Sequence, residues 1–211
     1  MMMNSLRQPM LEPLDIPYPA HLVHGCRMAN GRIVTIRPIR PDDSELEQEF
    51  VKSLSPRTRY YRFFNAIREL SPAMLDRFIR VDYRRQMTLV AVVREGGKEQ
   101  QVGVAQYVAE PHADACEFAV VVHDDWQRGG LGSLLINSLM RSATDAGMLR
   151  IGGEVMADNQ AMLELARKLG FSARTSRDDA TLMTVSKTLS TATIPVPAMR
   201  QDFDQLAPCA A

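Results

Sequence analysis

The feature that most constrains the fold is a glycine-rich turn, Gly129-Gly130-Leu131-Gly132, between a strand pattern and a helix pattern. The upstream run CEFAVVV (116–122) is rich in β-branched residues, and LLINSLMRSATDAG, from Leu134, places apolar residues at helical spacing. Glycine weakens a helix start, so the three glycines indicate that a ligand approaches the main chain closely. Phosphate is the usual ligand of such a turn.

The remaining pattern predicts a mixed α/β (α+β) fold with one domain. Before the glycine turn we expect a strand near 33–37, a helix over 45–54 capped by Asp42 or Asp43, and helices starting at Ser55-Pro56 and Ser71-Pro72. A meander of three strands follows, over 88–94, 101–110 and 116–122. After the turn we expect its helix, a strand over 148–156, a helix from Asn159 closed by Gly170, and strands near 171–175 and 182–187. These elements predict a mixed, mostly antiparallel central sheet of about six to seven strands flanked by helices. The domain is expected over 31–189, with an N-terminal extension (1–30) and a C-terminal tail (190–211).

Composition narrows the class of protein further. The 211 residues are 45% hydrophobic, enough for one core, and 25 basic residues balance 25 acidic ones, so no global charge favours nucleic acid or a membrane surface. Cys26, Cys116 and Cys209 are far apart and form no zinc-ligand spacing, so no metal is expected. Without a signal peptide or an apolar span, a cytoplasmic monomer or homodimer is expected.

Several interpretations of the glycine turn compete. A P-loop is excluded, because the turn lacks the closing Lys and Ser/Thr. A dinucleotide-binding turn would use Gly130 and Gly132, but Leu135 stands where its third glycine belongs, and a long antiparallel meander precedes it. A tight turn without any ligand remains an alternative.

Gln127-Arg128-Gly129-Gly130-Leu131-Gly132 matches the Q/R-x-x-G-x-G/A turn of the GNAT N-acetyltransferases, and the order of elements from about 31 to 189 also resembles that superfamily. The resemblance implies that the pyrophosphate of acetyl-CoA, the cosubstrate, binds the backbone amides of Arg128 to Ser133 at a positive helix end. It also implies that Asn159, which begins NQAMLELARKLGF, flanks the pantetheine arm while capping its helix.

Two glutamates are candidates for the base that deprotonates the acceptor amine. Glu117 and Glu154 stand in apolar strand runs, where we expect burial to raise the pKa of a carboxylate. The resemblance supports both: Glu117 matches the base of several protein-lysine acetyltransferases, and Glu154 that of ribosomal amino-terminal acetyltransferases. We favour Glu117, acting through water, over Glu154.

The same resemblance implies two further features of the chemistry. Strand amides around Val120, Val121 and Val122 would hold the thioester carbonyl oxygen. Many members protonate the departing thiolate with a tyrosine four residues before the closing glycine, but Ala166 occupies that position here. His123 is a further candidate base should both glutamates prove dispensable.

A finer resemblance concerns the acceptor. VTIRPIRPDD and LSPRTRYYRFF look like the acetyltransferase domain of bacterial protein-lysine acetyltransferases of the Pat type. This implies a protein lysine as acceptor, while a small-molecule amine and a non-catalytic acyl-CoA-binding domain remain alternatives. Taken as a helix, RTRYYRFF predicts aromatics mostly in the core and arginines in water.

Overall fold

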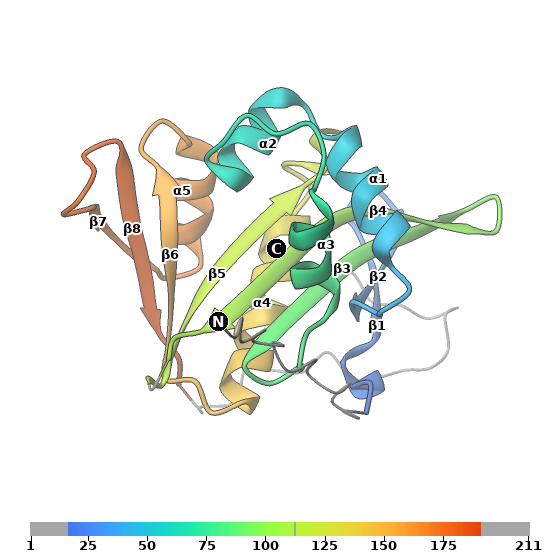
Figure 1. Cartoon of the computed structure of the whole chain (residues 1–211), viewed down its shortest axis with the longest axis horizontal. Coiled ribbons are helices and arrows are strands. Elements are labelled where there is room, and N and C mark those ends of the chain that lie inside the picture. Colours follow the sequence, from blue (N-terminus) through green and yellow to red (C-terminus); the bar gives the residue numbers. More distant parts are fainter. Residues whose placement is uncertain (1–16, 112, 191–211) are drawn as a thin grey trace, which may run out of the picture.

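The structure is a computed structural model that describes residues 17–111 and 113–190 (Figure 1). Most of the expected N-terminal extension and nearly all of the expected C-terminal tail lie outside the described residues.

The described residues form one eight-stranded sheet with the order β1-β2-β3-β4-β5-β6-β8-β7. Its strands are β1 (His24–Arg27), β2 (Ile33–Pro38), β3 (Gln86–Glu95), β4 (Lys98–Ala109), β5 (Ala115–Val122), β6 (Arg150–Met156), β7 (Ser172–Thr175) and β8 (Leu182–Thr188). The β5–β6 pair is parallel and every other pair is antiparallel. The mixed, mostly antiparallel sheet is confirmed, with one strand more than expected. The additional strand is β1, which we placed in the N-terminal extension; it is short and its sequence, HGCR, has no alternating apolar pattern.

Helices cover both faces of the sheet. They are α1 (Ser44–Ser53), α2 (Pro56–Phe63), α3 (Pro72–Ile79), α4 (Leu131–Asp145) and α5 (Gln160–Lys168), with short 3₁₀ turns η1 (Ala20–Leu22) and η2 (Asp124–Trp126). Figure 1 shows α1 and α3 in front of the sheet and α4 behind it, while α2 lies at the end of the sheet where β5 finishes. The site is built at that end.

Local sequence signals explain where most helices begin. The hydroxyl of Ser55 accepts a hydrogen bond from the Thr58 amide, and that of Ser71 from the Met74 amide, with proline in the first turn of each helix. Asp43 occupies the N-cap position of α1 but makes no side-chain cap bond. The expectation that it caps this helix with its carboxylate was wrong, because the buried Arg37 guanidinium binds both Asp43 oxygens, at 2.6 and 2.8 Å.

Two apolar clusters fill the two faces. One joins α4 and α5 to the sheet through residues such as Leu135, Ile151 and Val155. The other joins α1 and α3 to the opposite face through residues such as Phe50 and Val121. Because strand side chains alternate between faces, the cluster to which a strand residue belongs shows which helical layer its side chain and those of its neighbours face.

The parallel strands β5 and β6 separate partway along their length. Their ladder consists of three pairs and ends where Glu117 lies beside Gly152. Beyond that point β5 still pairs with β4 as far as Val122, and β6 still pairs with β8. One edge of β5 therefore opens between the two halves of the sheet.

Candidate active site

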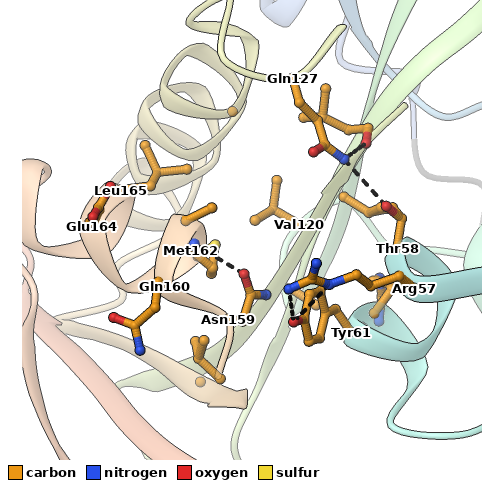
Figure 2. Close-up of a pocket in the computed structure, with 18 of the residues that line it drawn as sticks. Arg57, Thr58, Tyr61, Val120, Gln127, Asn159, Gln160, Met162, Glu164 and Leu165 are labelled. Carbon is orange, nitrogen blue, oxygen red and sulfur yellow. Dashed lines mark hydrogen bonds between the residues drawn. The ribbon is translucent and has the colours of Figure 1, made fainter. Parts of the chain in front are cut away.

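The opening between β5 and β6 continues into a groove of about 1160 Å³. Its walls come from β5, the β6–α5 turn, one face of α5, the glycine turn before α4, and α2. Figure 2 shows the side chains of α2 on one side of this groove and those of α5 on the other. Segments far apart in the sequence therefore meet at one cavity.

The glycine turn has the backbone shape of an anion cradle. Arg128 (φ 61°) and Gly130 (φ 88°) both adopt left-handed conformations. The helical hydrogen-bond ladder of α4 begins with the Leu134 amide bonding to the Gly130 carbonyl, so the amides of residues 131–133 precede it. A Cβ built on Gly130 would meet no atom within 4 Å, so the protein leaves this space open. These features fit a pyrophosphate at the helix N-terminus.

The predicted cofactor-binding residues contribute in different ways. Gly129, Gly130, Gly132 and Arg128 belong to the turn, whereas the side chain of Leu131 is fully buried and leaves only its backbone for a ligand. Ser133 lines the groove beside them. The Gln127 side chain is engaged within the protein: its Nε2 donates to the Val122 carbonyl at 3.1 Å and to Thr58 Oγ1 at 3.4 Å.

Asn159 has the capping role expected from its sequence position, while its contact with a pantetheine arm stays a prediction. Its Oδ1 accepts a hydrogen bond from the Met162 amide at 3.2 Å, which caps α5, and its side chain also lines the groove. Figure 2 shows it projecting between α5 and α2.

The backbone amides of the three valines of β5 point to different edges of the strand. The His123 amide donates to the Val102 carbonyl on β4, and backbone groups of an extended strand alternate in direction. The Val121 amide therefore faces β4, and those of Val120 and Val122 face the opened edge. Val121 also has its side chain in the α1–α3 cluster. The geometry offers two of the three predicted amides to a ligand.

Both candidate bases point to the face of the sheet that carries α1 and α3. Glu117 is four residues before Val121 on β5, so both side chains lie on the α1–α3 face. On β6, Ile151 and Val155 face the α4–α5 cluster, so Glu154 beside Val155 faces the other way. The two carboxylates therefore share one face, and both residues line the groove. Both residues are exposed. The expectation of burial was wrong, because their apolar sequence neighbours pack on the opposite face or beneath them, where the strands part. Ser176 donates a hydrogen bond of 3.4 Å to Glu154.

Helix α2 contributes groove residues that the sequence pattern did not single out. The expectation that the aromatics of RTRYYRFF lie mostly in the core was only partly right: Phe63 packs against the α1–α3 cluster, but Tyr60 and the C-cap residue Phe64 are each 43% exposed. The Tyr61 hydroxyl accepts hydrogen bonds from Arg57, at 3.0 and 2.8 Å, and donates one of 3.3 Å to Asp158 across the groove. The i, i+4 spacing of Arg57 and Tyr61 was visible in the sequence, but Asp158 was not a foreseeable partner.

A second contact ties α2 to the end of β5. The Asp124 carboxylate accepts hydrogen bonds from the Ser55 amide (2.9 Å), the Ser55 hydroxyl (2.7 Å) and the Thr58 hydroxyl (2.7 Å). Partial burial would raise the pKa of Asp124, but these donors outweigh it and hold that pKa below its usual range. Helix α2 is thus anchored beside the glycine turn.

Two ionisable side chains near the groove, Glu47 and Arg62, interact electrostatically. Glu47 is fully buried and accepts a hydrogen bond of 2.6 Å from Gln101. Burial raises the pKa of Glu47 to about 7. Loss of hydration lowers the pKa of the half-buried Arg62 to about 10, although the charges of Glu47 and Glu117 oppose that change. Arg62 lines the groove and links the buried carboxylate to the exposed one electrostatically.

Two other predicted positions lie away from the groove lining. Ala166 is 1% exposed and packs in the core beneath α5. His123 caps η2 by accepting a hydrogen bond from the Asp125 amide. Among the described residues, no group of three His, Cys, Asp or Glu side chains could hold a metal ion.

The splayed β5–β6 pair and the glycine turn at the start of α4 match the acyl-CoA-dependent transferase fold that the sequence resemblance implies. The model of the "Acetyltransferase (GNAT) domain" family matches residues 34–172. The chain belongs to the GNAT acetyltransferase family, whose cosubstrate is acetyl-CoA.

Individual relatives agree with this assignment. The chain is 40% identical over 152 residues to an acetyltransferase of Pseudomonas aeruginosa, covering 72% of this chain and 82% of that protein. It is 33% identical over 145 residues to the acetyltransferase Pat of Mycolicibacterium smegmatis, covering 68% of this chain but only 43% of Pat. The GNAT domain of S. lividans PAT superposes with a TM-score of 0.75 at 26% identity, covering 82% of this chain and all of that domain. Within the described ranges, none of the helices is long and apolar enough to cross a bilayer.

Proposed function

We propose that this acetyltransferase transfers the acetyl group of acetyl-CoA to lysine side chains of proteins in the cytoplasm, with Glu117 as the base. The observation that carries the proposal is the exposure of Glu117 and Glu154 in an open groove on one face of the sheet. A lysine on a folded partner can reach such a groove by its four-carbon stem, whereas a site specialised for a small amine usually encloses it. The resemblance to Pat-type enzymes supports the same acceptor.

The proposed reaction is direct transfer. Glu117 accepts a proton from the lysine ammonium through a water molecule, and the neutral amine then attacks the thioester carbonyl. A lysine has an ordinary pKa near 10.4, so a nearby carboxylate increases the fraction of productive encounters at neutral pH. The amides of Val120 and Val122 would stabilise the carbonyl oxygen as it becomes negative.

The cosubstrate would be held at two places along the groove. The glycine turn, with the amides of Arg128 to Ser133, takes the pyrophosphate, and Asn159 flanks the pantetheine arm. The close approach of α4 and α5 supports this path: a Cβ on Gly132 would lie 3.0 Å from the Leu165 side chain. These residues thus shape both the turn and the groove.

The test is to incubate the purified protein with acetyl-CoA and a bacterial lysate, and then to locate new acetyl groups by mass spectrometry. Acetylated lysines that depend on both the protein and acetyl-CoA are expected. Free CoA released only with small amines would favour a small-molecule acceptor. Binding of acetyl-CoA without release of CoA under any condition would favour a non-catalytic acyl-CoA-binding domain.

A further inference from the structure

In acyl transfer from a thioester the departing sulfur leaves faster when it receives a proton, and Tyr61 on the groove wall is a candidate donor. The helix position at which many relatives carry a tyrosine is Ala166, whose methyl group is buried in the core. A side chain at that position therefore does not supply the proton. The donor must come from another wall of the groove, or from solvent.

The described lining of the groove contains few groups able to act as this acid. It includes no His or Cys, and Tyr61 is the phenol among its residues. Lys168 also lines the groove, but it is the last residue of α5. At 1.5 Å per residue, its position is roughly 13 Å along the helix from Asn159. Tyr61, by contrast, is linked through its hydroxyl to Asp158, the residue immediately before Asn159.

Two charged side chains hold the Tyr61 hydroxyl in place. Arg57 donates from Nε at 3.0 Å and from Nη2 at 2.8 Å to the phenolic oxygen. Hydrogen bonds from a guanidinium stabilise an anionic oxygen more than a neutral one. The Asp158 carboxylate accepts from the same hydroxyl at 3.3 Å, so the proton is directed across the groove at Asp158, the residue immediately before Asn159. Figure 2 shows the Tyr61 hydroxyl directed toward Asn159, with Val120 between the α2 and α5 walls of the cavity.

We propose that Tyr61 is the general acid of the transfer and that Arg57 positions it and stabilises its anion. This inference rests on the proposed acetyl transfer. When the tetrahedral intermediate collapses, the C–S bond breaks, the sulfur keeps the electron pair, and it takes the proton from Tyr61 Oη. The resulting phenolate is held by Arg57. It regains a proton from the nitrogen of the new amide through water, so the proton lost by the amine ends on CoA.

The competing role for Tyr61 is a strap that closes the groove through Asp158 without any proton transfer. A strap would affect the binding of acetyl-CoA or of the acceptor. A general acid would affect turnover, and only with a leaving group that needs a proton. The two roles therefore predict different responses to a change of leaving group.

The test compares Tyr61→Phe with Tyr60→Phe, a matched control that removes an exposed hydroxyl from the adjacent residue. With acetyl-CoA, Tyr61→Phe should lower kcat by roughly 10²-fold and leave both KM and the ligand-induced shift in melting temperature near wild type. Tyr60→Phe should change neither. With the selenium analogue of acetyl-CoA, whose selenol leaves as a stable anion, Tyr61→Phe should regain most of the wild-type rate. Arg57→Gln should show the same dependence on leaving group with a smaller loss.

Other outcomes overturn the inference. Full activity of Tyr61→Phe excludes the general acid, and so does an equal loss with both donors or an effect confined to KM. If the wild-type protein and Tyr60→Phe bind acetyl-CoA but transfer acetyl to no amine, the proposed function fails and the role of Tyr61 fails with it. A loss in Tyr61→Phe alone, without leaving-group rescue, refutes only the general acid.

Discussion

Glu117 of β5 lies beside Gly152 of β6 at the last pair of their parallel ladder, and the strands part immediately beyond it. This relationship places a carboxylate at the point where one edge of β5 becomes free. The proposed base, the unpaired amides of β5 and the proposed opening for the pantetheine arm therefore lie close together because of a single feature of the sheet.

The first prediction concerns the base. Glu117→Gln should keep the stabilisation by acetyl-CoA but lower the acetylation rate by roughly 10²–10⁴-fold, because the amine loses its proton acceptor. The loss should shrink at high pH, where the amine deprotonates without help. Rates measured from pH 6.5 to pH 10 test this. Glu154→Gln is the control; if it alone shows the large pH-dependent loss, the base is Glu154, and if neither variant does, His123 is the next candidate.

The second prediction concerns the glycine turn. Acetyl-CoA should raise the melting temperature, because a concentration a hundredfold above Kd adds about 2.7 kcal/mol to the free energy of unfolding. Gly132→Val should abolish the shift, because Gly132 lines the groove and a larger side chain there would crowd the pyrophosphate. A Cβ on Gly132 would lie 3.0 Å from Leu165 Cδ2, the movable end of a side chain, whereas the φ of 88° at Gly130 would strain any other residue. A variant that melts like wild type alone yet keeps the full shift contradicts the cradle.

The third prediction concerns the buried carboxylate of Glu47, whose folded pKa of about 7 lies above its unfolded value. Such a group stabilises the fold below the unfolded pKa, and this contribution is lost as pH rises through about 7. The free energy of unfolding should therefore fall by about 2–3 kcal/mol between pH 5 and pH 8 on account of this group. Urea unfolding of Glu47→Gln should lack that decline, while Glu49→Gln, exposed on the same helix, should retain it. Equal slopes in Glu47→Gln and wild type would refute the assignment.

The fourth prediction concerns the anchor of α2. Asp124→Asn weakens the acceptor shared by Ser55 and Thr58 and should cost about 1 kcal/mol of stability, a modest value because the site is partly solvated. Amide hydrogen exchange over residues 56–63 should accelerate more than exchange in α4. Asp125→Asn, with its side chain 84% exposed, provides the control. Unchanged exchange in α2 would show that other contacts hold the helix.

The sequence by itself determined the elements whose signals are local. Ser-Pro starts defined α2 and α3, the glycines defined the turn before α4, and Asn159 defined the start of α5, because caps and positive φ angles depend on a few neighbouring residues. The turn also carried the resemblance to GNAT proteins. These features define the proposed cosubstrate end of the site.

Only the tertiary structure decided the acceptor side. The exposure of Glu117 depends on where β5 and β6 separate. Tyr61 and Asp158 are 97 residues apart in the chain and meet only because α2 lies across the end of the sheet. The Asp43 carboxylate binds Arg37 rather than its own helix for the same reason. Burial and pairing are set by contacts between distant segments, and a one-dimensional pattern does not specify those contacts.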